Sequence, residues 1–266
     1  MPLESNESNG PMRILSLVPS ISELLVALGL APRMVGRTGF CIHPAEVMVR
    51  LPKVGGTKDV NLDKVRRLAP THLIVNMDEN RKETVDALRD FIPHVLVTHP
   101  NAPEDNLQLL AQLTDAFGHC PGVRDKAGVL AQDLQAALGE LRSLSWPGQR
   151  VLYLIWREPW MTVARDTYIA RMLAEVGWQT WPAVAGGEVG AARYPALDGT
   201  ESWLGDVQRV LLSSEPYAFD EHHIEEAQAL CPGAKVQCVD GELLSWYGPR
   251  AAQGLRYLRE LALDLR

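Results

Sequence analysis

The sequence predicts an α/β fold of two lobes, each a parallel-type sheet covered by helices, joined by one long central helix. Short apolar runs typical of buried strands alternate with helical patterns, as in parallel sheets that helices cover on both faces. The longest helical pattern lies near the middle of the chain. After it the alternation starts again, because Arg13 and Arg150 open the first strand of each half and lie 137 positions apart.

The central pattern covers residues 123–144 and is bracketed by Pro121-Gly122 and by the breakers at 146–148. Its apolar side chains recur at intervals of three and four: Val123, Ala127, Leu130, Leu134, Ala137, Leu141 and Leu144. At about 1.5 Å per residue such a helix spans roughly 33 Å, enough to join two lobes. The pattern is equally compatible with a surface helix inside one large domain.

Strand and helix patterns alternate through the first half. The expected strands are residues 13–18, 34–36, 72–76 and 95–98, and the expected helices are 20–28, 62–68, 81–91 and 104–117. Ser20 and Glu23 have the spacing of a capping box at the first helix, and Gly29 is its stop signal. Residues 37–59 are expected to form a long loop.

The second half repeats the alternation. Its expected strands are residues 150–155, 209–213 and 235–239, and its expected helices are 167–176, 221–229 and 251–263. We therefore divide the chain into a disordered tail at 1–12, an N-terminal lobe at 13–120, a linking helix at 121–147 and a C-terminal lobe at 148–266.

Composition excludes several classes of partner. The 266 residues are 46% hydrophobic and carry a formal charge of −7, which argues against nucleic acid or an anionic membrane as partner. No apolar run approaches the roughly 20 residues of a membrane span. The four cysteines show no paired zinc spacing, so we expect buried, reduced thiols, with a Cys231–Cys238 disulfide as the alternative.

Residues 1–11 lack the basic and apolar regions of a secretory signal, so the chain as written is expected in the cytoplasm. A chain from which a signal had been removed would look the same and would belong in the periplasm.

Aromatic residues mark a candidate binding surface. All seven Trp and all six Tyr follow Leu144, and two clusters, at 156–160 and 245–247, fall in loops after expected strands. The carboxyl ends of parallel strands are where α/β lobes bind ligands. Such loops would cost solubility unless they met a partner, so they predict a wall against a large flat or apolar ligand. The alternative is a core built from loops.

Other candidate residues carry weaker signals. Cys41 and His43 offer a soft donor and an imidazole, but a closed metal site needs four ligands. We therefore expect a buried thiol and a packed imidazole, with an axial contact to a metal already held in a chelate as the alternative. The glycines before Thr57 would let backbone approach a ligand or simply make a turn. Arg250 could bond a polar ligand edge or pair with Asp240.

Acidic residues follow equivalent strands of the two halves. Glu79 and Glu215 lie 136 positions apart, and exposed acids in such places can orient a partner that carries matching arginines. Solubilising charge is the alternative. No GxSxG, HExxH or GxGxxG motif is present, so the sequence favours a binding protein over an enzyme. Chelatase-like chemistry with His43 as metal ligand or base is the minority reading.

Two stretches together resemble the vitamin B12 and iron-siderophore substrate-binding proteins of ABC importers. They are the run from Arg13 to Gly29 (RILSLVPSISELLVALG) and the run from Pro52 to Leu62 (PKVGGTKDVNL), which precedes the LAPTHLIV strand entry. The resemblance covers the chain from about Met12 onward. It implies a fold like the class III periplasmic binding proteins, with a ligand held between two lobes.

The resemblance also implies functional residues. The positions that match ligand-lining ones are Phe40, Cys41, His43, Thr57, Trp156, Arg157, Trp160, Trp246, Tyr247 and Arg250. Glu79 and Glu215 match acids that dock on an ABC permease. The implied ligand is a cobalamin or other corrinoid, then a siderophore or haem, with no cofactor of the chain's own. A cytoplasmic corrinoid or haem carrier of the same fold is the alternative.

Overall fold

The computed structural model describes residues 11–264. The contacts within the described chain group it into two compact units, residues 11–98 and 99–264. Each unit is built on its own parallel sheet with helices packed against it, so the predicted α/β class is confirmed. The division into a tail, two lobes and a linking helix stays a prediction, and its proposed disorder at 1–12 lies largely outside the described residues.

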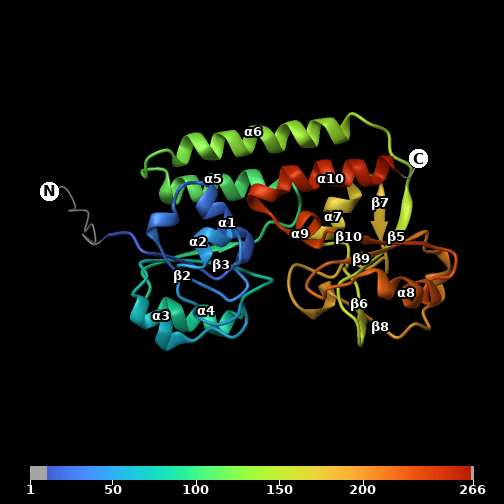
Figure 1. The fold of residues 1–266 in the computed structure, drawn as a ribbon, viewed down its shortest axis with the longest axis horizontal. Helices are drawn as coiled ribbons and strands as arrows, with labels where there is room; N and C mark the ends of the chain where they lie inside the picture. Colours follow the sequence, from blue (N-terminus) through green and yellow to red (C-terminus); the bar gives the residue numbers. More distant parts are fainter. Residues whose placement is uncertain (1–10, 265–266) are drawn as a thin grey trace. The chain divides into compact units, whose positions relative to one another are not determined.

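The first unit places its strands in the order β2-β1-β3-β4. These strands are β1 (Ile14–Ser16), β2 (Met34–Arg37), β3 (His72–Asn76) and β4 (His94–Thr98), and the helices are α1 (Pro19–Ala27), α2 (Ala45–Met48), α3 (Leu62–Leu68) and α4 (Lys82–Arg89). All neighbouring pairs are parallel, and Ile14 lies beside His72 in the register. One face of the sheet packs on α3 and α4 through Leu15 and Leu73. Figure 1 shows these two helices below the sheet.

The second unit places its parallel strands in the order β10-β9-β5-β7. Its strands are β5 (Gln149–Leu154), β6 (Trp160–Met161), β7 (Trp178–Thr180), β8 (Ala196–Leu197), β9 (Arg209–Ser213) and β10 (Lys235–Val239). Its α-helices are α5 (Asp105–Phe117), α6 (Val123–Arg142), α7 (Tyr168–Ala174), α8 (Ile224–Leu230), α9 (Gly241–Ser245) and α10 (Ala251–Leu263). Strands β6 and β8 form a separate antiparallel pair.

The two sheets share one topology. Reading each unit in chain order, the second strand lies at one edge and is followed by the first, third and fourth strands. Strand β5 therefore corresponds to β1, and β9 corresponds to β3. The internal repeat expected from the spacing of Arg13 and Arg150 is confirmed at the level of strand order.

Helix α6 is the long helix of the sequence pattern and packs against α5 and α10 (Figure 1). Val123, Ala127, Leu134 and Leu141 of the predicted stripe are buried. Asp133 of α6 forms an ion pair with Arg256 of α10. The contacts of α6 thus assign it to the second unit.

The predicted capping box at Ser20 is wrong. Helix α1 begins one residue earlier, at Pro19, and its N-cap, Val18, makes no side-chain cap bond. Proline is well suited to the first helical position because its φ is already fixed at a helical value. An N–H at this position would have no acceptor within the helix, so proline loses nothing by lacking one. Ser22 instead donates its hydroxyl to the Val18 carbonyl at 2.9 Å.

The cysteines are all free thiols. Cys41, Cys120 and Cys231 are buried as predicted, whereas Cys238 is exposed, so the Cys231–Cys238 disulfide is not formed. Within the described residues, no helix has the length and apolar character needed to cross a membrane.

Candidate ligand-binding site

The loop after β2 carries the first group of predicted residues and is fixed by Arg37, a buried residue. The Arg37 guanidinium donates to the carbonyl of Met48 at 2.6 Å and to those of Thr38 and Cys41 at 3.0 Å each. A buried guanidinium needs such acceptors, and they come from the start of the loop, at Thr38 and Cys41, and from the end of α2, at Met48. These hydrogen bonds therefore fix the conformation of the loop.

Phe40 and Cys41 lie on opposite sides of that loop. The Phe40 ring is 63% exposed, in keeping with its predicted ligand role. The Cys41 thiol is fully buried and lies 3.1 Å from the hydroxyls of both Ser22 and Thr38, and burial raises its pKa. The expectation of a buried thiol therefore holds at Cys41, and an axial contact from Cys41 to a ligand metal does not fit this burial. His43 follows on the loop and is half-buried.

Asn80 connects the loops at the carboxyl ends of β1 and β3. Its buried amide donates to the carbonyl of Thr57 at 2.9 Å and to that of Leu17 at 3.4 Å, and its oxygen accepts from the Asn76 N–H at 2.9 Å. This contact brings the predicted residue Thr57 to the carboxyl end of β3. The sequence pattern selected Thr57 and Glu79 but gave no sign that Asn80 joins their two loops.

Glycine at position 55 serves a turn within the chain. Gly55 has φ +122°, and a Cβ there would lie 2.1 Å from the Asp59 carbonyl oxygen. The adjacent Gly56 lies under the Phe40 ring, where a Cβ would meet the ring at 3.4 Å. Of the two readings left open for this segment, the turn therefore explains Gly55.

Met77 is an exposed apolar residue that the sequence analysis missed. It follows β3 directly and is 45% exposed, like Phe40 and Ile42 on the loop after β2. The signal available in the sequence was an apolar residue placed between a buried strand and the acids at 78 and 79. These side chains form the apolar part of the carboxyl edge of the first sheet.

In the second unit, the loop after β5 is a hairpin turn that holds two of the predicted tryptophans. Ile155 N–H donates to the Met161 carbonyl at 2.9 Å, and Met161 N–H donates to that of Trp156 at 3.0 Å. Trp156 is 42% exposed, whereas Trp160 stacks on Phe219 and packs against the core of the unit. The hairpin thus presents Trp156 and anchors itself through Trp160.

Tyr217 supports Trp156 from the loop after β9. The two rings meet edge to face with centroids 5.7 Å apart. The Tyr217 hydroxyl lies 3.2 Å from His223 Nε2, and His223 Nδ1 lies 2.8 Å from an Asp220 carboxylate oxygen. The predicted residue Arg157 beside Trp156 is ion-paired with Glu226 at 2.8 Å.

Trp246 and Tyr247 are buried rather than exposed, so for them the structure favours the alternative of a core built from loops. Tyr247 packs edge to face on Tyr168, with centroids 5.9 Å apart. The Arg250 guanidinium lies 4.9 Å from the centroid of the Trp246 ring and pairs with Glu242 at 2.6 Å. The alternative pairing of Arg250 with Asp240 is thus replaced by one with Glu242.

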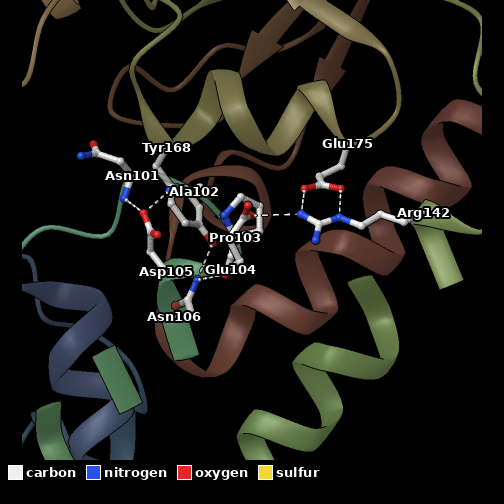
Figure 2. A network of polar contacts seen from close by, with 9 residues as sticks. All are labelled: Asn101, Ala102, Pro103, Glu104, Asp105, Asn106, Arg142, Tyr168 and Glu175. Carbon is white, nitrogen blue, oxygen red and sulfur yellow. Dashed lines mark hydrogen bonds and ion pairs between the residues drawn. The ribbon is translucent and has the colours of Figure 1, made fainter. Parts of the chain in front are cut away.

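Asn106 fixes the chain that follows Tyr247. Its amide group donates to the Pro103 carbonyl at 2.9 Å and to the Tyr168 hydroxyl at 3.2 Å, and its oxygen accepts from the Gly248 N–H at 2.6 Å. Figure 2 shows Asn106 and Tyr168 facing each other across the start of α5. A side chain of α5 thereby determines where the segment after α9 lies.

The two predicted docking acids lie in different environments. Glu79 is half-buried after β3, and its N–H donates to the Asn76 side chain at 3.3 Å. The Glu215 carboxylate accepts from the Ser245 hydroxyl at 3.1 Å and from the Trp246 indole N–H. The expectation of an exposed acid at 215 is therefore wrong, because this carboxylate is directed into its own unit.

Within residues 11–264, no group of three or more His, Cys, Asp or Glu side chains could hold a metal ion. The surface hollows on the second unit, beside Gln228 of α8 and beside Gln208 before β9, are not lined by predicted ligand residues. In each unit, the candidate binding residue is the exposed aromatic residue at the carboxyl edge of its sheet, Phe40 in the first and Trp156 in the second.

A family model described as periplasmic binding protein matches residues 14–195. The chain belongs to this periplasmic binding protein family. An uncharacterised ABC transporter substrate-binding lipoprotein of Bacillus subtilis is 23% identical over 267 residues, with 94% of this chain and 79% of the relative covered. A vitamin B12-binding protein of Photorhabdus laumondii is 25% identical over 122 residues, or 46% of this chain and 44% of the relative.

Solved structures share the fold of this binding protein. The periplasmic vitamin B12 binding protein BtuF of Vibrio cholerae superposes with a TM-score of 0.77 at 20% identity, over 95% of this chain and 98% of that one. A periplasmic haem binding protein of Pseudomonas aeruginosa gives 0.76 at 22% identity, over 96% and 94%. The family model and the names of these relatives describe binding proteins, so the prediction of a binding protein is confirmed.

Proposed function

We propose that this chain captures a metal-chelate ligand for an ABC importer, with a corrinoid such as cobalamin as the first candidate and a siderophore or haem next. The proposal is supported by membership of the periplasmic binding protein family and by relatives named for vitamin B12 and haem. A role in import requires a location outside the cytoplasmic membrane, as for the periplasmic and lipoprotein relatives.

The observation that carries the proposal is the exposure of Phe40 and Trp156 on loops with a fixed structure. Each lies at the carboxyl end of a parallel sheet, where α/β units bind ligands. Exposed aromatic rings are costly in water, and holding them on rigid loops reduces the entropy lost when a flat ligand binds. Arg37 fixes the first loop and the 155–161 hairpin fixes the second.

The other predicted ligand residues take secondary roles in this proposal. Thr57 and His43 lie at the same edge of the first sheet as Phe40, with His43 as the candidate axial donor to the chelated metal. Arg157 offers a guanidinium beside Trp156. Trp160 acts by anchoring the hairpin.

For the importer, we propose that Glu79 meets a basic residue of a permease. Its position after the third strand of its sheet is the one the family resemblance selects. Glu215 occupies the equivalent position of the second sheet, but its carboxylate is engaged within the unit. Permease docking through Glu215 would need that carboxylate to leave its partners.

The test is a binding titration of the wild type and of the double variant Phe40→Ala/Trp156→Ala with cobalamin, haem and a ferric siderophore. We expect one ligand to bind the wild type and the double variant to bind it at least about tenfold more weakly, as for central aromatic contacts at other interfaces. Both side chains are exposed, so the thermal midpoint should change little.

Val129→Ala is the matched control, because Val129 is an exposed apolar residue on α6. Its affinity should equal that of the wild type. Equal affinity of the double variant and the wild type would remove the two exposed rings from the binding surface.

A further inference from the structure

The segment 245–250, between α9 and α10, carries three of the residues expected to contact ligand: Trp246, Tyr247 and Arg250. Since Trp246 and Tyr247 are mostly buried, their placement is set by the groups around them. The segment lies beside the carboxyl ends of β9 and β10, because Gly241 at the start of α9 donates its N–H to Ser214 at 2.9 Å.

Two polar side chains from distant parts of the sequence hold this segment. Glu215 accepts hydrogen bonds from Ser245 and from the Trp246 indole at its beginning. Asn106 accepts from the Gly248 N–H at 2.6 Å near its end. Arg250 then lies over the Trp246 ring, so the placement of the indole also sets that of the guanidinium.

Glu215 is itself held rigidly. Its N–H donates to the Ser213 hydroxyl at 3.3 Å, and that hydroxyl donates to the Glu215 carbonyl at 2.6 Å. Tyr153 of β5 donates its hydroxyl to Ser213 at 3.0 Å. A Cβ at Gly241 would lie 2.9 Å from the Glu215 backbone nitrogen, so only glycine fits beside it. The carboxylate therefore has little freedom to move away from its donors.

We propose that Glu215 is a positioning residue whose ionisation orders the segment 245–250, so that the placement of Trp246 depends on pH. For ligand affinity, this inference rests on the proposed function; for the placement of Trp246, it does not.

The charged groups around Glu215 fit this role. Burial raises the pKa of Glu215, the hydrogen bonds from Trp246 and Ser245 lower it, and Glu242 and Asp240 raise it further, with a net upward shift. Glu242 is paired with Arg250, and on the side of the sheet Tyr153 donates a hydrogen bond to Ser213. The Glu215 carboxylate therefore takes up a proton at a pH closer to neutral than an exposed glutamate does.

Protonation weakens the hold on Trp246. Hydrogen bonds to an ionised carboxylate are roughly twice as strong as those between neutral groups, so the neutral acid holds the indole and the Ser245 hydroxyl less firmly. Asn106 does not titrate, and its bond to Gly248 stays the same over this pH range. The segment is thus loosened at its Trp246 end on acidification.

The experiment follows the indole N–H signals of tryptophan in ¹H–¹⁵N NMR spectra from pH 4 to pH 8, with the Trp246 signal assigned through Trp246→Phe. We expect the Trp246 signal to titrate with a midpoint above about 4.3, the ordinary value for glutamate. Trp146 is an internal control because its indole donates to a backbone carbonyl, that of Leu141, at 2.9 Å. Its signal should not follow this titration.

Variants assign the titration to a residue. Glu215→Gln keeps an acceptor oxygen but cannot ionise, so the chemical shift of its Trp246 indole N–H should not change with pH. Glu242→Gln should keep the titration, and so should Asn106→Ala. Three results would each overturn the proposal: a Trp246 chemical shift that does not change with pH in the wild type, an unchanged titration in Glu215→Gln, or loss of the titration in Glu242→Gln. The measurement on Glu242→Gln remains decisive even if Glu215→Gln does not fold.

Cyanocobalamin is the probe for the affinity arm. Wild-type affinity should fall by about fivefold from pH 7.5 to pH 4.5, the difference expected between a charge-assisted and a neutral hydrogen bond. Glu215→Gln should show the lower affinity at both pH values. Absence of cyanocobalamin binding with an intact Trp246 titration would count against the proposed ligand alone, whereas pH-independent binding by the wild type would overturn the link to affinity.

Discussion

Asn106 illustrates how single buried polar side chains shape this protein. Its amide serves three partners from different parts of the chain, namely Pro103, Tyr168 and Gly248. Arg37 and Asn80 do the same for the loops of the first unit. Such residues were invisible to sequence patterns, because an isolated asparagine or arginine does not show which distant carbonyl it meets.

At the same scale, we predict that Asn106→Ala destabilises the protein far more than Arg142→Ala does. Loss of the amide leaves buried groups of Tyr168 and Gly248 unsatisfied, which costs about 2–3 kcal/mol. Arg142 pairs with Glu104 and Glu175 at a more exposed site (Figure 2), where ion pairs are worth about 0–1 kcal/mol.

Chemical denaturation of both variants measures this difference. The effect of Arg142→Ala should shrink at high salt, while that of Asn106→Ala should not, because salt screens exposed charges. Equal losses of unfolding free energy would contradict the contrast.

Helices and strands followed the sequence closely where their patterns were long or strongly apolar. Strands β3, β9 and β10 and helices α3 and α10 were predicted with their observed bounds. The missed elements were short, such as α9 and the two-residue strands β6 and β8, which have no room for a periodic pattern. Strands β6 and β8 are paired with each other, and α9 is capped by Asp240.

The candidate site stays a prediction, but the structure shows which of its residues are exposed. The rule of carboxyl strand ends selected the loop of Trp156, the family resemblance selected Phe40, and both residues are exposed. The burial of Trp246 could not be read from the sequence, because its acceptor, Glu215, lies 31 positions away. An aromatic cluster in a loop looks the same whether it faces solvent or packs inward.

Two helix-interior glycines give a matched prediction at the scale of elements. A Cβ at Gly128 of α6 meets nothing within 4 Å, whereas one at Gly254 of α10 would lie 2.0 Å from the Leu243 carbonyl oxygen. Gly128→Ala should stabilise the protein by about 0.5–1 kcal/mol through helix propensity. Gly254→Ala should destabilise it by about 1–3 kcal/mol, because the backbone of α9 must move.

Thermal unfolding of the two variants decides this prediction. A rise in midpoint for Gly254→Ala would mean that α9 and α10 do not pack as closely as described. A fall for Gly128→Ala would contradict the open surroundings of that position.

For the whole molecule, membership of the periplasmic binding protein family supports the proposed function. The repeated strand order gives the two units sheets of the same topology. Each unit places a carboxyl sheet edge with an exposed aromatic residue, Phe40 in one and Trp156 in the other. The charge of −7 fits a partner that is neither a nucleic acid nor an anionic membrane. A protein that binds a chelate should return it unchanged, whereas a chelatase would alter it.

Native mass spectrometry of the wild type with a panel of corrinoids, haem and ferric siderophores tests this claim most directly. We predict a single adduct per chain, a corrinoid first, with the mass of the added ligand unchanged. The absence of an adduct with every member of the panel, or a mass showing loss or exchange of the metal, would contradict it.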